Sequence, residues 1–584
     1  MIHTLENMGK PFMEAVAYVF VKYPEFTQAY TTGVRWVFVA LSVYILLRAI
    51  ISLLRSKNPS EIWAYLTLPD GTDKALRHWE NVLGRASTSD VPIDVMSVSR
   101  NHGTLVRDTY GTWYYNDLGS KGGSRINGSP VRGTAIVKMG DTLSLGGADC
   151  TLLPASLQEQ QDNRYKRKKL SGTFSPWASL IALTLFQILL VIQFIAAEGS
   201  KLPITVPAAF LVLTATMWIY SISLSAMRRR AFEMETIAFF LSTLGIAVTV
   251  TSAPNEVMKQ VLTVLMGIGL FLGLCWYLRN LDRALGVRRF LAAASVLLLL
   301  INIVLGTNKY GATNWVKLGG FSVQPSELVK IAFIFIGAAT LDELFQKKNL
   351  GLFLGFSAIC LGSLAIMGDF GTAAIFFVTF LVISFMRSGD FSKLFLIIGA
   401  AGLGGLLILR FKPYILGRFE TWLHAWEFAD KGGYQQTRTM IASSSGGLLG
   451  LGPGKGFLQK LAAADTDLVF GILCEEWGLV IGVLAILSIV TLSIFAVRSI
   501  KAGRSAYYTI AACAATTLLI FQTILNVFGS VDLLPLTGVT FPFVSNGGTS
   551  MIASWGLLAF LKAADTRQNA SLAVKSQDLE ENEI

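Results

Sequence analysis

Four carboxylates lie close together in the stretch LAAADTDLVFGILCEEWGLVI, residues 461–481. Asp465 and Asp467 stand before a long apolar run, and Glu475 and Glu476 follow about two to three helical turns inside it. A carboxylate at membrane depth is costly in lipid, so such residues usually face a bundle interior or a water-filled cavity. A helix cap would account for one aspartate. It does not account for the glutamate pair, so this stretch is predicted to carry a functional site.

The composition is that of a membrane protein that crosses the bilayer many times. The chain has 584 residues, of which 53% are hydrophobic and 15% charged, and its mean hydropathy is +0.54. The net charge of +11 comes from short basic blocks between apolar runs, which is typical of cytoplasmic loops rather than of a nucleic-acid-binding face. Five scattered cysteines and four histidines predict no zinc site, disulfide framework or other certain metal site.

The apolar runs predict about 13 membrane helices of about 20 residues each. An extracytoplasmic segment, 1–32, is expected to be short and exposed, and the first span is 33–54. Two additional spans lie in 175–230, about ten form a core in 235–565, and a polar tail occupies 566–584. The predicted spans after the first are 175–196, 204–226, 235–253, 258–278, 288–306, 326–344, 351–367, 371–387, 394–411, 468–497, 507–529 and 544–563.

Basic residues recur in alternate connections between these spans, which should therefore be cytoplasmic. The same assignment puts residues 60–155, the basic linker 156–174 and the C-terminal tail in the cytoplasm. It puts the connections 307–325, 368–370, 412–467 and 530–543 outside. The basic residues that decide it are Arg228, Arg229, Arg230, Arg283, Arg288, Arg289, Lys347, Lys348, Arg387, Lys393, Arg498, Lys501 and Arg504.

The predicted outer segments carry polar residues that a plain loop does not need. Glu327 and Lys330 are three residues apart, so they share a helix face and can pair within the bilayer. A buried ion pair is weak evidence for stability, and this pair is therefore predicted to line a polar cavity. Asp369 lies in a tight hairpin, where it is either a site residue or a turn residue. Arg418 lies in the long outer connection.

Residues 60–155 contain short β-prone pieces separated by Gly, Asn, Asp and Ser, which predicts a small all-β sandwich domain. The order of their motifs resembles a forkhead-associated (FHA) domain. The matching pieces are Gly84-Arg85, Ser99-Arg100-Asn101-His102, Asp117-Leu118-Gly119-Ser120 and Asn127-Gly128.

The FHA resemblance implies recognition of a phosphothreonine-bearing protein, since an Arg fork and a hydroxyl suit a phosphate dianion. It implies phosphate contacts at Arg85 and Ser99, help from Arg100 and Lys121, and structural roles for Gly84, His102 and Asn127. The chain departs from the family after Ser120, where Lys121-Gly122-Gly123 replaces the common Thr-Asn-Gly. A sandwich that has kept its fold and lost its ligand is the alternative.

Residues 235–564 resemble the SEDS family of cell-wall glycan polymerases (FtsW, RodA and SpoVE). The chain departs from the family pattern at Asn314, where Arg is frequent, and at Asn546, where Tyr is usual. The matching motifs are Asn314-Trp315, Gln324-Pro325-Ser326-Glu327 with Lys330, Gly368-Asp369-Phe370-Gly371-Thr372-Ala373, Gly433-Tyr434-Gln435, Ser445-Gly446-Gly447, Thr466-Asp467 with Glu475-Glu476, and Leu534-Pro535 through Gly547-Gly548.

The SEDS resemblance implies a peptidoglycan glycosyltransferase that polymerises lipid II, the undecaprenyl-pyrophosphate-linked disaccharide peptide, with a class B penicillin-binding protein as partner. Such a reaction needs a base near the attacking hydroxyl and positive charge near the diphosphate. Asp467 is predicted to be that base. The candidates to meet the diphosphate are Arg418, Arg438 and Lys455 of the long outer connection, of which Arg418 is favoured, and a divalent cation such as Mg²⁺ or Mn²⁺ could do part of that work. The full set of predicted substrate or cavity residues is Glu327, Lys330, Arg418, Asp369, Gln435, Glu475, Glu476 and Ser545.

Two other functions remain open from the sequence. A lipid II transporter, or flippase, would also have many spans and a charged pair at membrane depth. A non-catalytic membrane scaffold would recruit phosphorylated partners through the β-sandwich. The concentration of unusual residues in outer segments, on one side of the membrane, favours an enzyme over a transporter.

Overall fold

The computed structural model describes residues 2–55, 62–108, 111–162, 175–309, 312–318, 321–411, 413–500, 505–565 and 571–573. The basic residues predicted at 164–169 of the linker lie outside the described residues. So does the predicted tail 566–584, apart from 571–573.

Two helices precede the β-sandwich, and the structure differs here from the prediction for residues 1–32. They are α1 (Ile2–Lys22) and α2 (Pro24–Arg55). Met13, Ala17 and Phe20 of α1 are buried at helical spacing, and α1 contacts α4 (Trp177–Glu198). Pro24 begins α2, because proline is favoured at the first position of a helix, where its missing N–H would have no intrahelical partner.

The β-domain (residues 64–154) is a sandwich of two sheets, as predicted. Within the described residues the strand orders are β2-β1-β11-β10-β7-β8 and β4-β3-β5-β6-β9. Leu66, Leu83, Leu105, Tyr115 and Leu143 are among the fully buried residues of its core. The strands are β1 (Ala64–Thr67), β2 (Asp73–Leu76), β3 (Glu80–Gly84), β4 (Val91–Pro92), β5 (Gly103–Arg107), β6 (Trp113–Asp117), β7 (Ser124–Ile126), β8 (Ser129–Pro130), β9 (Thr134–Val137), β10 (Thr142–Leu145) and β11 (Ala148–Pro154).

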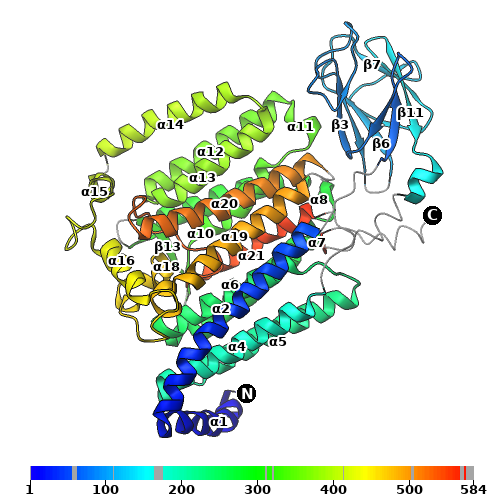
Figure 1. Ribbon diagram of the computed structural model, residues 1–584. Helices are drawn as coiled ribbons and strands as arrows, with labels where there is room; N and C mark the ends of the chain where they lie inside the picture. The colour runs from blue at the N-terminus through cyan, green and yellow to red at the C-terminus, as the bar shows by residue number, and fades with distance from the viewer. Residues whose placement is uncertain are drawn as a thin grey trace.

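The rest of the chain is a helical bundle, with the β-domain at one of its ends (Figure 1). Among the described residues ten helices are long and apolar enough to cross a membrane, which confirms the predicted fold class. Those of the bundle other than α2 and α4 are α5 (Thr205–Ala226), α6 (Glu233–Ser252), α7 (Val257–Tyr277) with the turn η2 (Pro254–Glu256), α9 (Arg288–Leu305), α12 (Lys347–Met367), α13 (Phe370–Ser388), α19 (Leu479–Ile500) and α20 (Ala506–Ser530).

Further helices complete the bundle. The predicted span 326–344 is not continuous, because α10 ends at Gly337 and a separate turn, α11, follows. At 1.5 Å per residue α10 is only about 20 Å long, less than the bilayer core. These helices are η1 (Gly199–Lys201), α8 (Leu281–Gly286), α10 (Pro325–Gly337), α11 (Leu341–Leu344), α14 (Phe391–Phe411) and α21 (Gly548–Ala564).

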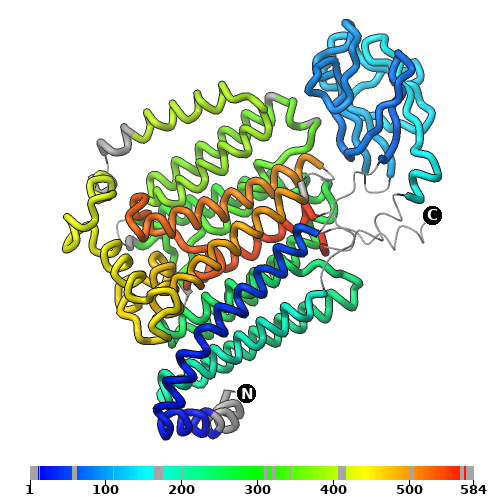
Figure 2. Tube along the Cα trace, viewed as in Figure 1, coloured from blue at the N-terminus to red at the C-terminus, as the bar shows by residue number. Residues whose placement is uncertain are grey.

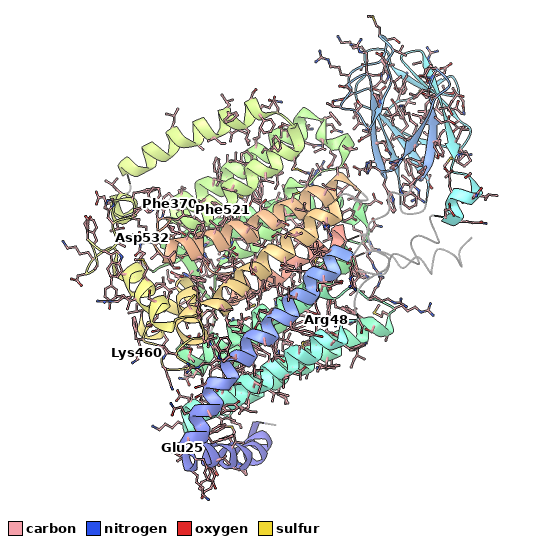
Figure 3. The ribbon with its side chains drawn as sticks, in the orientation of Figure 1. Glu25, Arg48, Phe370, Lys460, Phe521 and Asp532 are labelled. Atoms are coloured by element: carbon pink, nitrogen blue, oxygen red, sulfur yellow. The ribbon has the colours of Figure 1, made fainter. Side chains whose placement is uncertain are left out.

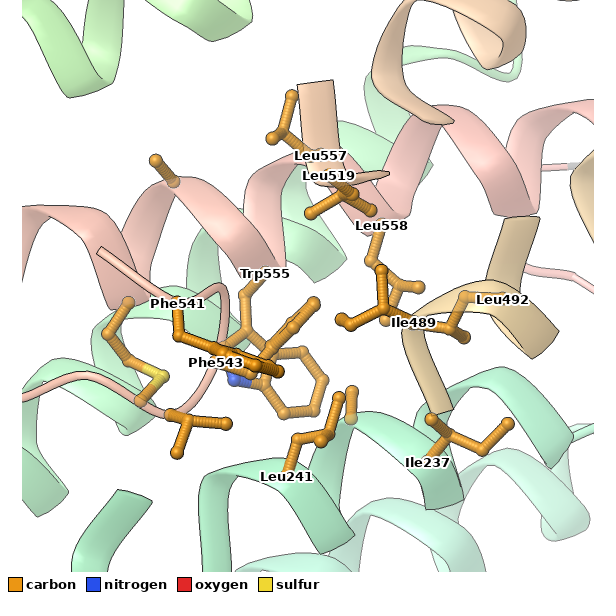
Figure 4. Packing of buried hydrophobic residues seen from close by; sticks show 14 of the residues in the cluster. Ile237, Leu241, Ile489, Leu492, Leu519, Phe541, Phe543, Trp555, Leu557 and Leu558 are labelled. Atoms are coloured by element: carbon orange, nitrogen blue, oxygen red, sulfur yellow. The ribbon is translucent and has the colours of Figure 1, made fainter. Parts of the chain in front are cut away.

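Helix α21 lies at the centre of the bundle. Trp555 of α21 packs against Phe543, with ring centroids 5.9 Å apart, and both rings are buried. Figure 4 shows Leu241 of α6 and Ile489 of α19 beside them. This packing fixes the segment that precedes α21, which contributes to the site below.

The predicted span 468–497 is broken at its beginning, so the prediction of one continuous helix is wrong. Two short helices, α17 (Ala464–Asp467) and α18 (Val469–Ile472), precede a π-helical turn, η4 (Leu473–Trp477). Gly478, with φ of 93°, then separates this turn from α19. A left-handed residue inside an apolar run ends the helix, and glycine adopts it without strain.

Connections of the bundle fold over the end that lies away from the β-domain, called the distal end below (Figure 2). They contain an antiparallel sheet of β12 (Thr307–Lys309), β13 (Ala312–Leu318) and β14 (Phe321–Val323). They also contain α15 (Pro413–Thr421), α16 (Tyr434–Gly446) and the turn η3 (Leu458–Lys460). Figure 3 shows Phe370, Lys460 and Asp532 toward this distal end.

Candidate active site

A cavity of about 600 Å³ lies among the distal connections, next to Phe370. Three aspartates and an arginine line it together, namely Asp369, Asp465, Asp467 and Arg418. They come from three separate stretches of the chain, all of them within connections that were predicted to be outer. The start of α7, residues of β13 and β14 with Gln324, and the segments 535–540 and 546–548 also line it. The structure therefore brings the predicted outer motifs into one polar site.

Asp467 is the last residue of α17 and lies outside the ten spanning helices. Its main-chain carbonyl accepts a hydrogen bond of 3.0 Å from Asn526 of α20, which fixes the backbone. Gly538 faces its carboxylate, and a Cβ at that glycine would come within 3.1 Å of an Asp467 oxygen. Burial raises the pKa of Asp467 to about 6, although Thr466 and the charge of Arg418 oppose the shift. A carboxylate with this pKa is suited to general-base chemistry near neutral pH.

Arg418 reaches the cavity from α15. One of its nitrogens donates to the carbonyl of Leu536 at 2.8 Å, which ties α15 to the opposite wall. Lys259 of α7 also lines the cavity and was not singled out from the sequence. Two cations and several carboxylates in one wall can hold an anionic group and a proton acceptor side by side.

Asp369 is held as a structural cap. Its carboxylate accepts from Thr372 N at 3.1 Å, from Asn314 Nδ2 at 2.9 Å and from Gln324 Nε2 at 3.1 Å. Three such donors hold the carboxylate in a fixed position. The sequence left two interpretations of Asp369 open, a site residue or a turn residue. These contacts favour the turn residue, although Asp369 also lines the cavity.

Glu327 and Lys330 form the predicted pair but do not line the cavity. Their charged groups are 2.7 Å apart, and Lys330 is 1% exposed. Lys330 also donates to Gln522 at 3.0 Å, and Gln522 donates to the carbonyl of Thr540, a cavity residue. The pair therefore supports the wall from behind rather than facing a ligand.

Glu475 and Glu476 are also absent from the described wall, so their prediction as cavity residues is not supported. Both are buried, and they bind the glycine loop (residues 447–457) through its main chain. Glu475 accepts from the N–H groups of Phe457 and Leu458 at 2.9 and 3.1 Å, and Glu476 accepts from Gly454 at 3.2 Å. The breaks at η4 and Gly478 turn both carboxylates toward this loop.

Gln435 and Ser545 have supporting contacts. Gln435 donates to the carbonyl of Ala462, close before the aspartates. The Ser545 hydroxyl donates to the carbonyl of Thr466 at 2.6 Å. Neither is among the described residues that line the cavity. Both fix the segment that carries Asp467.

The predicted phosphate-binding residues of the β-domain share one end of it. Gly84 is required there, because a Cβ would come within 2.1 Å of the Arg100 carbonyl. Arg85 is exposed and its main-chain N–H donates to Ser99 O at 2.9 Å. The Ser99 hydroxyl accepts from Lys121 N at 3.1 Å. The side chains of Arg85, Arg100 and Lys121 are all exposed, and the Arg85 guanidinium donates to the Met96 carbonyl at 3.4 Å.

His102 and Asn127 support this end of the β-domain. Fully buried His102 accepts from Ser99 N through Nδ1, so its other nitrogen donates to the Gly123 carbonyl at 3.2 Å. Burial lowers the pKa of His102, which keeps the ring neutral. Asn127 adopts a left-handed φ of 50° and bonds Asp141 and Thr142 N. These contacts agree with the predicted structural roles.

Comparison with known proteins identifies the larger part of the chain. Residues 231–570 match the model of the cell cycle protein family FtsW/RodA/SpoVE. The chain belongs to this family. Residues 81–146 match the FHA domain model. The N-terminal helices α1, α2, α4 and α5 lie outside both matches.

Individual relatives agree with the FtsW/RodA/SpoVE assignment. A probable peptidoglycan glycosyltransferase FtsW of Buchnera aphidicola is 31% identical over 294 residues, 48% of this chain and 73% of that protein. A peptidoglycan glycosyltransferase RodA of Mycobacterium bovis is 28% identical over 323 residues, 52% of this chain and 69% of that protein. A chain of a solved peptidoglycan synthase complex is 23% identical, with a TM-score of 0.47, over 57% of this chain and 98% of that chain.

The two positions at which this FtsW/RodA/SpoVE member departs from the family pattern both bind cavity aspartates. Asn314 donates to Asp369, and Asn546 donates through its side chain to Asp465 at 2.8 Å. The Asn546 N–H also donates to the Asp465 carbonyl at 2.9 Å. From the sequence, these asparagines were interpreted only as departures from the family. The signal that could have identified them as site residues is a polar residue beside an aspartate motif.

Arg35 of α2 is a second contact that the sequence did not reveal. Its guanidinium donates to the carbonyls of Gly450 and Leu451 at 2.7 and 2.6 Å. A helix outside the family region therefore binds the same glycine loop that Glu475 and Glu476 bind. The loop leads directly through η3 into the segment of Asp465 and Asp467.

We expect Arg35→Ala to loosen the glycine loop. Loss of two charge-assisted hydrogen bonds costs about 2 kcal/mol in a partly exposed position. Amide hydrogen exchange at Leu451 and Gly452 should therefore rise by about 30-fold, since 1.4 kcal/mol corresponds to tenfold. Arg48→Ala, at the other end of α2, is the control and should leave this exchange unchanged. If amide exchange at Leu451 and Gly452 is the same in Arg35→Ala and Arg48→Ala, Arg35 does not hold the glycine loop.

Proposed function

We propose that this chain is a peptidoglycan glycosyltransferase that polymerises lipid II into glycan strands at the outer face of the bacterial cytoplasmic membrane. Membership of the FtsW/RodA/SpoVE family and the names of its relatives support the enzyme class. The observation that carries the proposal is the cavity in which Asp467, with its raised pKa, faces the charge of Arg418. A lipid-linked sugar diphosphate needs that combination of base and cation.

In the proposed reaction an acceptor sugar hydroxyl attacks the anomeric carbon of the lipid-linked strand. The new glycosidic C–O bond forms as the bond to the diphosphate oxygen breaks, and the bonding electrons leave with the diphosphate. Asp467 takes the proton of the hydroxyl. Arg418, with Lys259, balances the charge that develops on the leaving group. Asn526 and Ser545 hold the main chain around Asp467, so its carboxylate needs little rearrangement during the reaction.

In this proposal a divalent cation is a further source of positive charge for the diphosphate. Among the described residues no three carboxylate, Cys or His side chains are grouped closely enough to hold a metal alone. The diphosphate of the substrate would then supply part of the coordination, with Asp369 or Asp465, which leaves Asp467 free to take the proton. That pattern suits Mg²⁺, which is commonly bound by few carboxylates together with substrate phosphates.

We also propose the sidedness given by the basic connections. The β-domain contacts the start of α20, and in the sequence a predicted basic connection precedes that helix, so this end of the bundle would be cytoplasmic. The cavity lies at the distal end, which would be extracytoplasmic. A class B penicillin-binding protein is the proposed partner, and the family supports that proposal.

The direct test uses the full chain, purified with and without a candidate penicillin-binding protein and given lipid II. Glycan polymer longer than the starting disaccharide is the expected product. Movement of lipid II across vesicle membranes, without formation of polymer, would instead support the transporter. If the folded protein, with its partner present, gives no polymer and does not move lipid II, the result would favour the scaffold.

The β-domain is proposed to bind phosphothreonine through Arg85 and Ser99. Arg85→Ala should weaken binding of a peptide pool with one fixed phosphothreonine by about 10–100-fold, because a hydrogen-bonded charge is lost. Fluorescence anisotropy of the labelled pool measures this. Arg77→Ala, directly after β2 and before β3 begins, is the matched control and should bind as the wild type does. Equal binding of the unphosphorylated pool would mean that the site does not read phosphate.

A further inference from the structure

Glu80, the first residue of β3, connects the β-domain to the helical bundle. Its carboxylate accepts from the N–H of Ala506 at 3.0 Å and from the N–H of Leu341 at 3.3 Å. The hydroxyl of Ser505 also bonds to it. Glu80 is only 7% exposed. A nearly buried carboxylate with three donors from another part of the chain forms a specific contact rather than a chance surface encounter.

The contact lies at the beginning of α20. The first N–H groups of a helix have no partner within the helix, and a negative charge there is favourable. Ser505 caps α20 by accepting from Tyr507 N, and Glu80 accepts from the neighbouring Ala506 N. Leu341 begins α11, so the same carboxylate joins two helix starts. Figure 1 shows the β-domain beside the end of the bundle at which α11 lies.

The other end of α20 supports the active site. Asn526 donates to the carbonyl of Asp467 and, at 2.7 Å, to that of Val539. One turn earlier Gln522 binds both Lys330 and Thr540. Between Ala506 and Asn526 the helix is continuous, and at 1.5 Å per residue it covers about 30 Å. One helix therefore connects Glu80 with the main chain of the proposed base.

Strand β3 makes the corresponding connection inside the β-domain. It runs from Glu80 to Gly84, and Arg85 of the proposed phosphate site follows it. At about 3.3 Å per residue its ends are about 15 Å apart. All five of its residues are buried, so the strand does not move independently of the domain core. Tyr114 lies at the end of the domain that faces the bundle. Burial and then the carboxylates of Asp108 and Asp282 raise its pKa, and because Asp282 belongs to α8, the bundle acts on this end of the domain.

We propose that Glu80 is a positioning residue through which the β-domain sets the geometry of Asp467. A phosphorylated ligand at Arg85 and Ser99 changes the rate of polymerisation through β3, Glu80 and α20. The proposal rests on the function proposed above and specifies how the β-domain regulates it. A shift of about 1 Å at a reacting group is enough to change a rate substantially, so a cap at the far end of a rigid helix is sufficient for control.

The test compares the full-length wild type with Glu80→Gln, which keeps the side-chain size and removes the charge. Glu159→Gln is the matched control, because Glu159 binds Tyr65 and Ser156 within the β-domain. We expect Glu80→Gln to lower kcat by about tenfold with KM for lipid II nearly unchanged. The phosphothreonine peptide pool should change the wild-type rate and leave that of Glu80→Gln unchanged, while both bind the pool equally.

Amide hydrogen exchange separates this proposal from the enzymatic one. In Glu80→Gln, exchange should increase at the start of α20 and at 463–468, whether or not polymer is formed. No polymer from the wild type, together with these exchange changes, would overturn the proposed reaction and leave the connection standing. Unchanged exchange and an unchanged kcat in Glu80→Gln would overturn the connection. A wild-type rate that does not respond to bound peptide would overturn its regulatory role.

Discussion

Asp467→Asn should lower the rate of lipid II polymerisation by about 10²–10⁴-fold, the usual contribution of a general base. Asparagine has the same size and keeps the main-chain bond from Asn526, but it cannot take a proton from the acceptor hydroxyl. The measurement is initial polymer formation at saturating lipid II. Asp390→Asn, at a half-buried aspartate in the connection between α13 and α14, is the matched control and should stay within about twofold of the wild type.

The pH dependence gives this prediction a second readout. The ionised carboxylate is the active form, and burial raises its pKa to about 6, so wild-type activity should fall as the pH drops through about 6. An ordinary aspartate would lose activity only near pH 4. Asp467→Asn should show no such step in its residual activity. A wild-type profile that is flat between pH 5 and 7 would contradict a base at Asp467.

Stability distinguishes a lost base from a damaged fold. Because the folded pKa of Asp467 lies above the unfolded value of 3.8, ionisation costs the folded state stability as the pH rises from about 4 through 6. Asp467→Asn avoids that cost, so its thermal midpoint at pH 7 should equal or exceed that of the wild type. An inactive and less stable variant would indicate a structural role instead.

Hydrophobic runs were sufficient to predict where the helices lie, because a bilayer demands about 20 apolar residues from any span. They did not predict the breaks at Gly337 and Gly478, since a glycine inside an apolar run is compatible with a continuous helix. The misplacement of Glu475 and Glu476 follows from the second break. A carboxylate that faces a cavity and one that binds main-chain N–H groups look the same in sequence.

The part of the site that the sequence predicted best is the part formed by local motifs. Asp467, Asp369 and Arg418 do meet in one cavity. The contacts that hold them in place join distant segments. Arg35 binds a carbonyl 415 positions away, and Glu80 binds an N–H 426 positions away. No periodicity or spacing reports such pairs, because they depend on how whole helices and the β-domain pack.

Lys330→Met should be the most destabilising of the predicted substitutions in the bundle. Lys330 and Glu327 are almost completely buried, and methionine removes one charge while leaving the other without its partner. Breaking a buried pair in this way costs about 3–5 kcal/mol, whereas replacing both partners by uncharged residues of similar size is often close to neutral. The thermal unfolding midpoint should therefore fall clearly for Lys330→Met.

The double variant Glu327→Gln/Lys330→Met completes the argument, because it removes both charges. Its thermal midpoint should recover most of the loss, which shows that the cost of the single variant is the uncompensated carboxylate rather than lost packing. Activity should recover less, since Gln522 no longer has the Lys330 ammonium to accept from while it holds Thr540 in the cavity wall. A double variant as unstable as Lys330→Met would mean that side-chain packing, not charge, dominates at this position. Full recovery of both stability and activity would show that the pair acts only within its own helix.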